Sequence, residues 1–156
     1  MHGIIKKIMG YIVILAITVT LAYLPNIEVN TQTGTWKDIS RGITGLTIQA
    51  LAIDSRNNNI LYAGTQSSGI FKTIDGGASW LPVNTGLTGI DVRSIVIDPT
   101  NSNIIYAVVY GYGVFKSINA GSSWAITGSG IPANYCINPL IIDPTNPNIL
   151  YVGHYT

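Results

Sequence analysis

Three tryptophans stand at a constant interval of 44 residues along this sequence. They are Trp36, Trp80 and Trp124. Most of the chain between and after them repeats at the same period: 48–80 (IQALAIDSRNNNILYAGTQSSGIFKTIDGGASW) returns with substitutions as 92–124, and a third copy begins at Ile137. A period of this length restricts the fold to an array of similar units, each too small to bury its apolar surface alone.

Each copy contains short apolar and β-branched runs separated by Asn, Gly, Pro and Ser, which are strand and turn signals. We predict strands in the first two copies at 48–54, 60–65, 69–74 and 79–83, and at 92–98, 104–110, 113–118 and 123–127. The third copy supplies two, at 140–143 and 149–154, and 35–39 resembles the strand that ends a copy. Repeats of four short strands at this period are typical of β-propeller blades. The expected fold class is therefore all-β, a β-propeller segment of about two and a half four-stranded antiparallel blades.

The first strand of every copy is apolar at consecutive positions, at Leu51–Ile53, Ile95–Ile97 and Leu140–Ile142. Successive side chains of a strand point to opposite faces, so these runs predict a sheet that is covered on both sides, as blades are by their neighbours. Propellers have about four to eight blades, more than this chain supplies. We therefore expect the sequence to be part of a longer reading frame. Assembly of several short chains into a ring is the alternative.

The N-terminus is basic and then apolar. Lys6 and Lys7 precede 8–24, a run without any charge. This pattern predicts a hydrophobic helix at 1–24 that is either a cleaved signal peptide or a membrane anchor. We expect a linker at 25–34 and the propeller repeats at 35–156. Both interpretations place the repeats outside the cytoplasm, secreted or membrane-anchored, with only the N-terminal segment touching a membrane.

The remaining composition excludes two classes. Of 8 basic residues, Lys6 and Lys7 belong to the leader, and 7 acidic residues balance the rest, so no basic stripe is present to bind nucleic acid. The single cysteine excludes an internal disulfide framework.

A short motif, Ser/Thr-x-Asp-x-Gly-x-Ser/Thr-Trp, ends the third predicted strand of each complete copy. Its residues are Thr73, Asp75, Gly77, Ser79 and Trp80, then Ser117, Asn119, Gly121, Ser123 and Trp124. This motif resembles the Asp-box of the bacterial neuraminidase repeat. The resemblance covers roughly 35–156 and places the chain beside sialidase-like, sortilin-like, xyloglucanase-like and photosystem II assembly-factor-like propellers. It implies a fold more strongly than an activity, because one fold hosts many functions.

The motif residues predict a turn rather than a catalytic site. The Asp75 carboxylate can accept hydrogen bonds from turn N–H groups, the glycines permit positive φ, and the serine hydroxyls can close the turn. The tryptophans are expected to pack as core. Asn119 keeps an acceptor without the charge, and Ala120 replaces Gly76, which fits a structural turn and not a pair of equivalent catalytic acids.

Two function classes remain. A glycoside hydrolase usually needs two carboxylates. Resemblance to a sialidase would further imply an arginine triad and an Arg-Ile-Pro segment; the only arginines here are Arg41, Arg56 and Arg93, and none of them precedes Ile-Pro. A xyloglucanase-like hydrolase stays as the alternative. We predict a binding or assembly scaffold for protein or carbohydrate, with no catalytic, cofactor or metal residues assigned. Tyr110 and Tyr112 are the candidate ligand contacts, and hairpin packing is their competing role. Asp91 is the non-repeated acid of an inter-blade loop.

Overall fold

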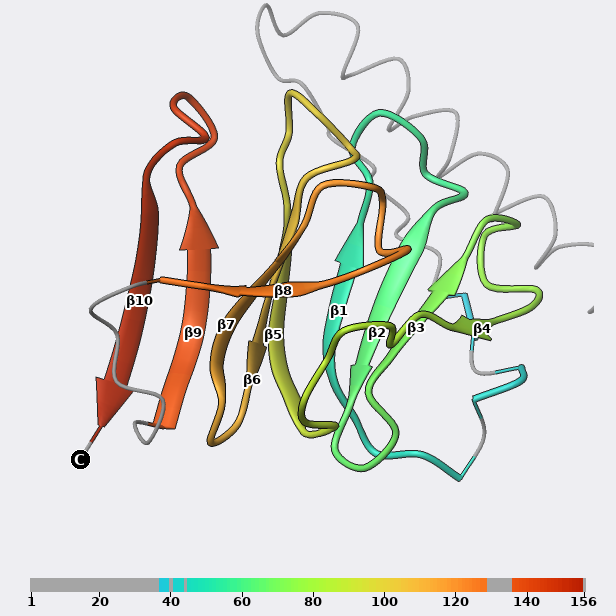
Figure 1. Cartoon of the computed structure of the whole chain (residues 1–156). Coiled ribbons are helices and arrows are strands. Elements are labelled where there is room, and N and C mark those ends of the chain that lie inside the picture. The colour runs from blue at the N-terminus through green and yellow to red at the C-terminus, as the bar shows by residue number, and fades with distance from the viewer. Residues whose placement is uncertain (1–36, 40, 44, 129–135, 156) are drawn as a thin grey trace, which may run out of the picture. The chain divides into compact units, whose positions relative to one another are not determined.

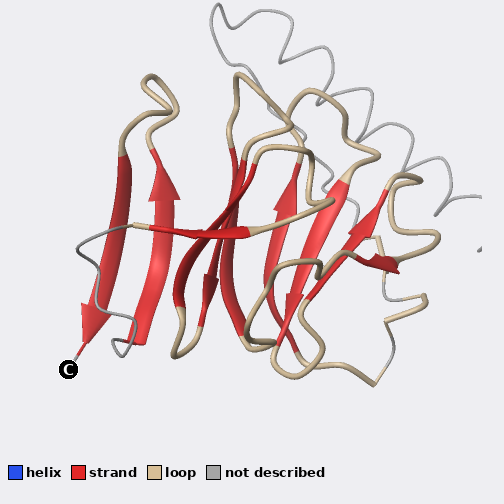
Figure 2. Cartoon of the chain, viewed as in Figure 1, coloured by secondary structure: helices blue, strands red, loops and turns tan. Residues whose placement is uncertain are grey.

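The computed structural model describes residues 37–39, 41–43, 45–128 and 136–155. The expected helix at 1–24, the linker at 25–34 and Trp36 lie outside these ranges. Every regular element in the described part of the chain is a β-strand (Figure 2). No helix long and apolar enough to cross a membrane occurs among the described residues.

The strands form three separate antiparallel sheets in chain order (Figure 1). The first sheet contains β1 (Ile48–Ile53), β2 (Leu61–Thr65), β3 (Ile70–Thr73) and β4 (Leu81–Pro82). The second contains β5 (Val92–Ile97), β6 (Ile105–Val109), β7 (Gly113–Ser117) and β8 (Ala125–Thr127). The third pairs β9 (Cys136–Ile142) with β10 (Leu150–Tyr155). All-β architecture with successive four-stranded antiparallel meanders is confirmed, and it is consistent with part of a β-propeller.

The predicted strands differ from the observed ones by two residues or more at three places: β4, β9, and β8, which begins at Ala125 and not at Ser123. β4 is limited to Leu81–Pro82, although 79–83 was expected, because Ser79 and Trp80 belong to the preceding turn. β9 begins at Cys136, four residues before the expected start at Leu140. Its register shifts between the pairs Leu140–Val152 and Ile137–His154, and Pro139 falls in that bulge, where a missing N–H costs no ladder hydrogen bond.

Bulges recur at the same place in the repeat. The register of β1 on β2 shifts between Ile48 and Ala50, and that of β5 on β6 between Val92 and Ser94. The residues that these bulges leave without a Cα partner are Gln49 and Arg93. A bulge bends the strand and changes the direction of the side chain at the unpaired residue. Gln49 and Arg93 therefore differ in side-chain direction from the paired residues of β1 and β5.

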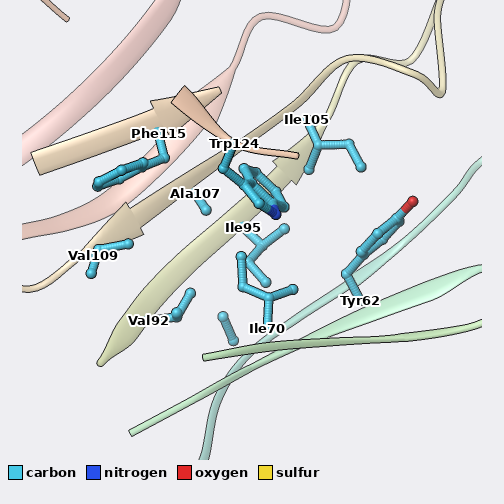
Figure 3. Packing of buried hydrophobic residues seen from close by; sticks show 10 residues of the cluster. Tyr62, Ile70, Val92, Ile95, Ile105, Ala107, Val109, Phe115 and Trp124 are labelled. Carbon is cyan, nitrogen blue, oxygen red and sulfur yellow. The ribbon is translucent and has the colours of Figure 1, made fainter. Parts of the chain in front are cut away.

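Apolar side chains between the first and second sheets form the largest core cluster (Figure 3). Tyr62 and Ile70 of the first sheet meet Val92, Ile105 and Phe115 of the second, and all five are nearly inaccessible to water. A second cluster joins β6 and β7 to β9 through Tyr106, Val108, Val114 and Leu140. The sheets therefore stack face to face, with buried apolar side chains between successive repeats.

The expectation that every first strand is covered on both faces is correct only for β5. Leu51 and Ile53 of β1 are 56% and 52% exposed, and Ile141 of β9 is 55% exposed. The physical reason is position in the stack. Only the second sheet has another described sheet on each of its faces, whereas the first and third have one such neighbour each.

Ala120 is the only described residue other than glycine with a positive φ, at 55°. It holds the place that Gly76, with φ of 68°, holds in the previous repeat. A left-handed conformation brings a Cβ atom close to the following carbonyl oxygen, at a cost of about 1–2 kcal/mol. The second turn is therefore strained at a position where the first is relaxed.

Replacing Ala120 with glycine is expected to stabilise the protein by about 0.5–1 kcal/mol, the relief of strain less the extra entropy of glycine in the unfolded chain. The matched reciprocal variant, Gly76→Ala, should destabilise it, because the added Cβ meets only Lys37 Nζ at 3.3 Å and Asn59 Oδ1 at 3.5 Å, which leaves φ as the main cost. Urea unfolding measures both. Equal signs for the two variants would refute the assignment of strain.

Candidate functional site

Two hairpin turns carry the repeated motif, at 73–80 and 117–124; we call them the motif hairpins. In the first, the Thr73 hydroxyl donates to Asp75 Oδ1 at 2.7 Å and accepts from the Gly77 N–H at 3.0 Å. The Ser79 N–H and hydroxyl donate to the two carboxylate oxygens of Asp75 at 2.9 and 2.5 Å. The carboxylate thus ties the two ends of the turn together.

The second motif hairpin reaches the same arrangement with an amide. Ser117 donates to Asn119 Oδ1 at 2.9 Å, and the Ser123 N–H donates to the same oxygen at 2.9 Å. Where the Ser79 hydroxyl donates to a carboxylate, the Ser123 hydroxyl instead accepts from Asn119 Nδ2 at 2.8 Å. The same turn therefore forms with an aspartate or an asparagine side chain. The negative charge of Asp75 is not needed to form it.

Each motif tryptophan reaches the repeat that precedes it. Both indoles are buried, with 6% of Trp80 and 5% of Trp124 exposed. The Trp124 Nε1–H donates to the Val83 carbonyl at 2.8 Å, directly after β4, and the Trp80 Nε1–H donates to the Ile39 carbonyl at 2.7 Å. Each indole thus satisfies its one donor, and the ring of Trp124 packs between the first and second sheets (Figure 3).

Hydrogen bonding holds the pKa of Asp75 well below its usual range. The Ser79 hydroxyl makes the largest contribution, followed by the Thr73 hydroxyl and the Ser79 N–H. A folded pKa below the unfolded value of 3.8 means that the stabilisation is complete above that value and is lost as pH falls through the folded pKa. The first motif hairpin is therefore sensitive to acid, and its amide counterpart carries no such titration.

Exchanging the Asp75 and Asn119 side chain types is expected to exchange the sensitivity to acid between the two motif hairpins. Asp75→Asn should flatten the loss of stability below about pH 4, and Asn119→Asp should steepen it, while both variants remain folded at neutral pH. Melting temperatures measured between neutral pH and about pH 3 provide the readout. An unchanged acid profile in Asp75→Asn would contradict the assignment of this titration to the motif hairpin.

The other end of the sheets is where the repeats differ. Loops β2–β3 and β4–β5 meet there, and Tyr110 N–H donates to the Asp91 carbonyl at 2.8 Å as Gln66 N–H does to the Thr47 carbonyl at 3.0 Å. The backbone is thus equivalent in both repeats, but the side chains are not. In the first repeat they are Thr47, Gln49, Gln66 and Ser68, and one period later Asp91, Arg93, Tyr110 and Tyr112. We call this end the variable end.

An ion pair forms the centre of the variable end. Arg93 donates from Nε and Nη2 to the two carboxylate oxygens of Asp91, each at 2.7 Å. Gln49 of the first sheet donates from Nε2 to Asp91 Oδ1 at 3.3 Å, so the carboxylate joins both repeats. The Arg93 and Asp91 side chains are 29% and 23% exposed, so solvent still reaches the pair. Its guanidinium fork fixes the plane of the carboxylate.

The two candidate tyrosines border this ion pair. Arg93 Cζ lies 4.8 Å from the centre of the Tyr110 ring, a cation–π distance. The ring of Tyr112 covers Gly89, where an added Cβ would lie 2.5 Å from Tyr112 Cδ2. Both tyrosines are nevertheless 45% exposed. Tyr110 and Tyr112 therefore combine the packing role with an accessible aromatic surface.

Sequence reasoning singled out Asp91, Tyr110 and Tyr112 but missed Gln49 and Arg93. Their signal was available, because both lie at the same position of the repeat and differ in charge. The cluster contains a single carboxylate, and no group of three or more His, Cys, Asp or Glu side chains suited to a metal ion occurs among the described residues. Chemically, the cluster offers two aromatic faces beside a charged, hydrogen-bonding centre.

Neither a family model nor a curated protein matches this sequence. Several solved structures do. An ancestral GH74 enzyme is 28% identical over 74% of this chain, with a TM-score of 0.61. The GH74 enzyme of Niastella koreensis is 23% identical over 68%, with a TM-score of 0.58, and the GH74 xyloglucanase of Xanthomonas campestris is 22% identical over 58%, with a TM-score of 0.51. The expected resemblance to xyloglucanase-like propellers is confirmed at the level of the fold. This chain spans only 14%, 17% and 16% of those three proteins.

Proposed function

We propose that this chain is a β-propeller segment that binds a carbohydrate at the variable end. The observation that carries the proposal is the contrast between the two ends of the repeats. At the motif end, Asp75 and Asn119 make matching turns, as a scaffold requires. At the variable end, an equivalent backbone carries Tyr110 and Tyr112 in place of Gln66 and Ser68. Loops on a rigid scaffold are the usual location of binding residues.

The chemistry of the variable end suits a sugar chain. A pyranose ring has an apolar face that packs on an aromatic ring, and hydroxyl groups that both donate and accept. The exposed faces of Tyr110 and Tyr112 supply the first contact. Asp91, Arg93 and Gln49 supply an acceptor and donors for the second, already held in place by their mutual hydrogen bonds. Preorganisation of this kind lowers the entropy lost on binding.

The likeness to an ancestral GH74 enzyme at 28% identity supports carbohydrate over a protein ligand. A second candidate function is hydrolysis, as part of a xyloglucanase-like glycoside hydrolase. Such a reaction uses two carboxylates about 5–10 Å apart. Asp91 is the only carboxylate of the described cluster, and it is paired with Arg93. Binding without hydrolysis therefore fits the described cluster better.

Our proposal includes export. The uncharged segment 8–24 after Lys6 and Lys7 supports a signal peptide or a membrane anchor that places the repeats outside the cytoplasm, where extracellular polysaccharide is met. Fusion of residues 1–34 to a reporter enzyme that is active only after export tests this step separately from ligand binding.

Soluble xyloglucan oligosaccharide is the probe for the binding site. Isothermal titration of the full chain should detect binding, and Tyr110→Ala and Tyr112→Ala should each weaken it at least about tenfold, or about 1.4 kcal/mol. Ile74→Ala is the matched control, because Ile74 is 70% exposed and lies at the motif end. Its affinity should equal that of the wild type.

The same samples separate the two candidate functions. Release of new reducing ends from xyloglucan would favour the hydrolase over a pure binding module. Absence of binding to xyloglucan and to a panel of other plant and bacterial polysaccharides would refute the carbohydrate proposal.

A further inference from the structure

A glycine between the first and second sheets faces the hairpin that carries the two candidate tyrosines. Gly89 lies two residues before Asp91, and a Cβ atom added to it would lie 2.5 Å from Tyr112 Cδ2 and 2.7 Å from Tyr112 Cε2. The distance to Val109 Cγ1 would be 2.8 Å. Carbon atoms in contact are normally about 3.5–4.0 Å apart. A larger residue at 89 must therefore displace the tyrosine ring or Val109.

Space, and not the sign of φ, requires the glycine at 89. Gly89 is not among the described residues that have a positive φ. One period earlier the requirement is reversed. Gly45 has a φ of 82°, and a Cβ atom added there would meet no atom within 4 Å. The counterpart of Tyr112 in that repeat is Ser68. The close fit at Gly89 therefore accompanies the aromatic ring.

The backbone of the tyrosine hairpin is anchored to the segment 89–93. The Tyr112 N–H closes the turn by donating to the Val109 carbonyl at 3.0 Å, and the Tyr110 N–H donates to the Asp91 carbonyl at 2.8 Å. These bonds fix where both side chains begin. The direction of each ring depends on what the ring touches.

The two rings are held by different contacts. Arg93 Cζ lies 4.8 Å from the centre of the Tyr110 ring, and the Asp91 carboxylate holds that guanidinium with two hydrogen bonds. The guanidinium therefore covers one face of the Tyr110 ring. The Tyr112 ring instead rests on Gly89 with its Cδ2–Cε2 side, and 45% of Tyr112 stays exposed. Gly89 therefore determines where the Tyr112 ring lies.

The exposure of this hairpin is a property of the repeat. In the first repeat, the equivalent hairpin residues Gln66 and Ser67 are exposed, although the second sheet is stacked on the first. A neighbouring sheet therefore leaves this position of the repeat open to solvent.

We propose that Gly89 is a positioning residue of the carbohydrate site at the variable end. It leaves the space in which the Tyr112 ring lies against the segment 89–93, beside the ion pair of Asp91 and Arg93. Arg93 does the same for Tyr110, so one short segment sets the direction of both aromatic contacts. The inference rests on the proposed function, because that function makes Tyr112 a sugar contact.

The variant Gly89→Ala tests this role without removing a side chain that would touch the sugar. In isothermal titration of the full chain with xyloglucan oligosaccharide, it should bind about tenfold more weakly than the wild type, because the added Cβ displaces the Tyr112 ring. In a Tyr112→Ala background the same substitution should leave the remaining affinity unchanged. Gly45→Ala is the matched control and should bind like the wild type, since its Cβ meets no atom within 4 Å.

Urea unfolding measures the same contact without a ligand. Gly89→Ala should lower the unfolding midpoint. Tyr112→Ala should suppress much of that loss because it removes the displaced ring, whereas Tyr110→Ala should not. Wild-type affinity in Gly89→Ala, or additive effects of Gly89→Ala and Tyr112→Ala in urea, would overturn the proposal while the proposed function stands. A wild type that binds no carbohydrate would refute the proposed function, and with it the role of Gly89 in binding.

Discussion

The rest of this structure depends on one contact, the indole of each motif tryptophan against the repeat before it. The sheets share no backbone ladder, so the stack is held by side chains. Trp124 provides both kinds of interaction that such a contact requires. Its ring joins the core cluster beside Ile105 and Phe115, and its single donor finds a carbonyl of the neighbouring repeat (Figure 3). A buried indole without that acceptor would leave an unsatisfied polar group, which costs about 1–3 kcal/mol. The motif hairpin places the tryptophan where both conditions are met.

This arrangement separates stability from recognition within a single repeat. The motif end tolerates Asp75 or Asn119, since either side chain closes the same turn, and the strain at Ala120 is absorbed there. At the variable end the backbone hydrogen bonds are equivalent in both repeats while the side chains differ. The Asp91 carboxylate joins the two repeats there, because Gln49 and Arg93 reach it from two sheets and make the cluster a fixed unit rather than a set of independent loops.

Local patterns predicted the strands well, because alternation, apolar runs and turn residues act over a few neighbouring positions. β5, β6 and β7 lie within one residue of the expected ranges. Most of the features that were not predicted depend on contacts between residues far apart in the chain. The exposed faces of β1 and β9 depend on which sheets lie beside them, and the partners of Trp80 and Trp124 lie 41 residues away in the chain. Tyr110 and Tyr112 were named from their loop, whereas Gln49 was missed because only the stacking of the sheets brings it to Asp91. Arg93 lies two residues after Asp91, so its pairing with that carboxylate was a local signal that sequence reasoning did not use. The structural role assigned to the motif residues stays a prediction, as does ligand contact by the tyrosines.

The direction in which each tryptophan reaches has a consequence for how such a chain acquires its structure. The indoles of Trp80 and Trp124 both bond to residues that were synthesised before them, and neither contact skips a repeat. Among the described residues, the side-chain hydrogen bonds between sheets join residues at most 58 positions apart, little more than one period. A chain that emerges N-terminus first from a ribosome or a translocation channel can dock each new sheet on a completed one, without waiting for distant sequence. Because each of these tryptophans bonds toward the N-terminus, the sheets can fold one after another in the order of synthesis.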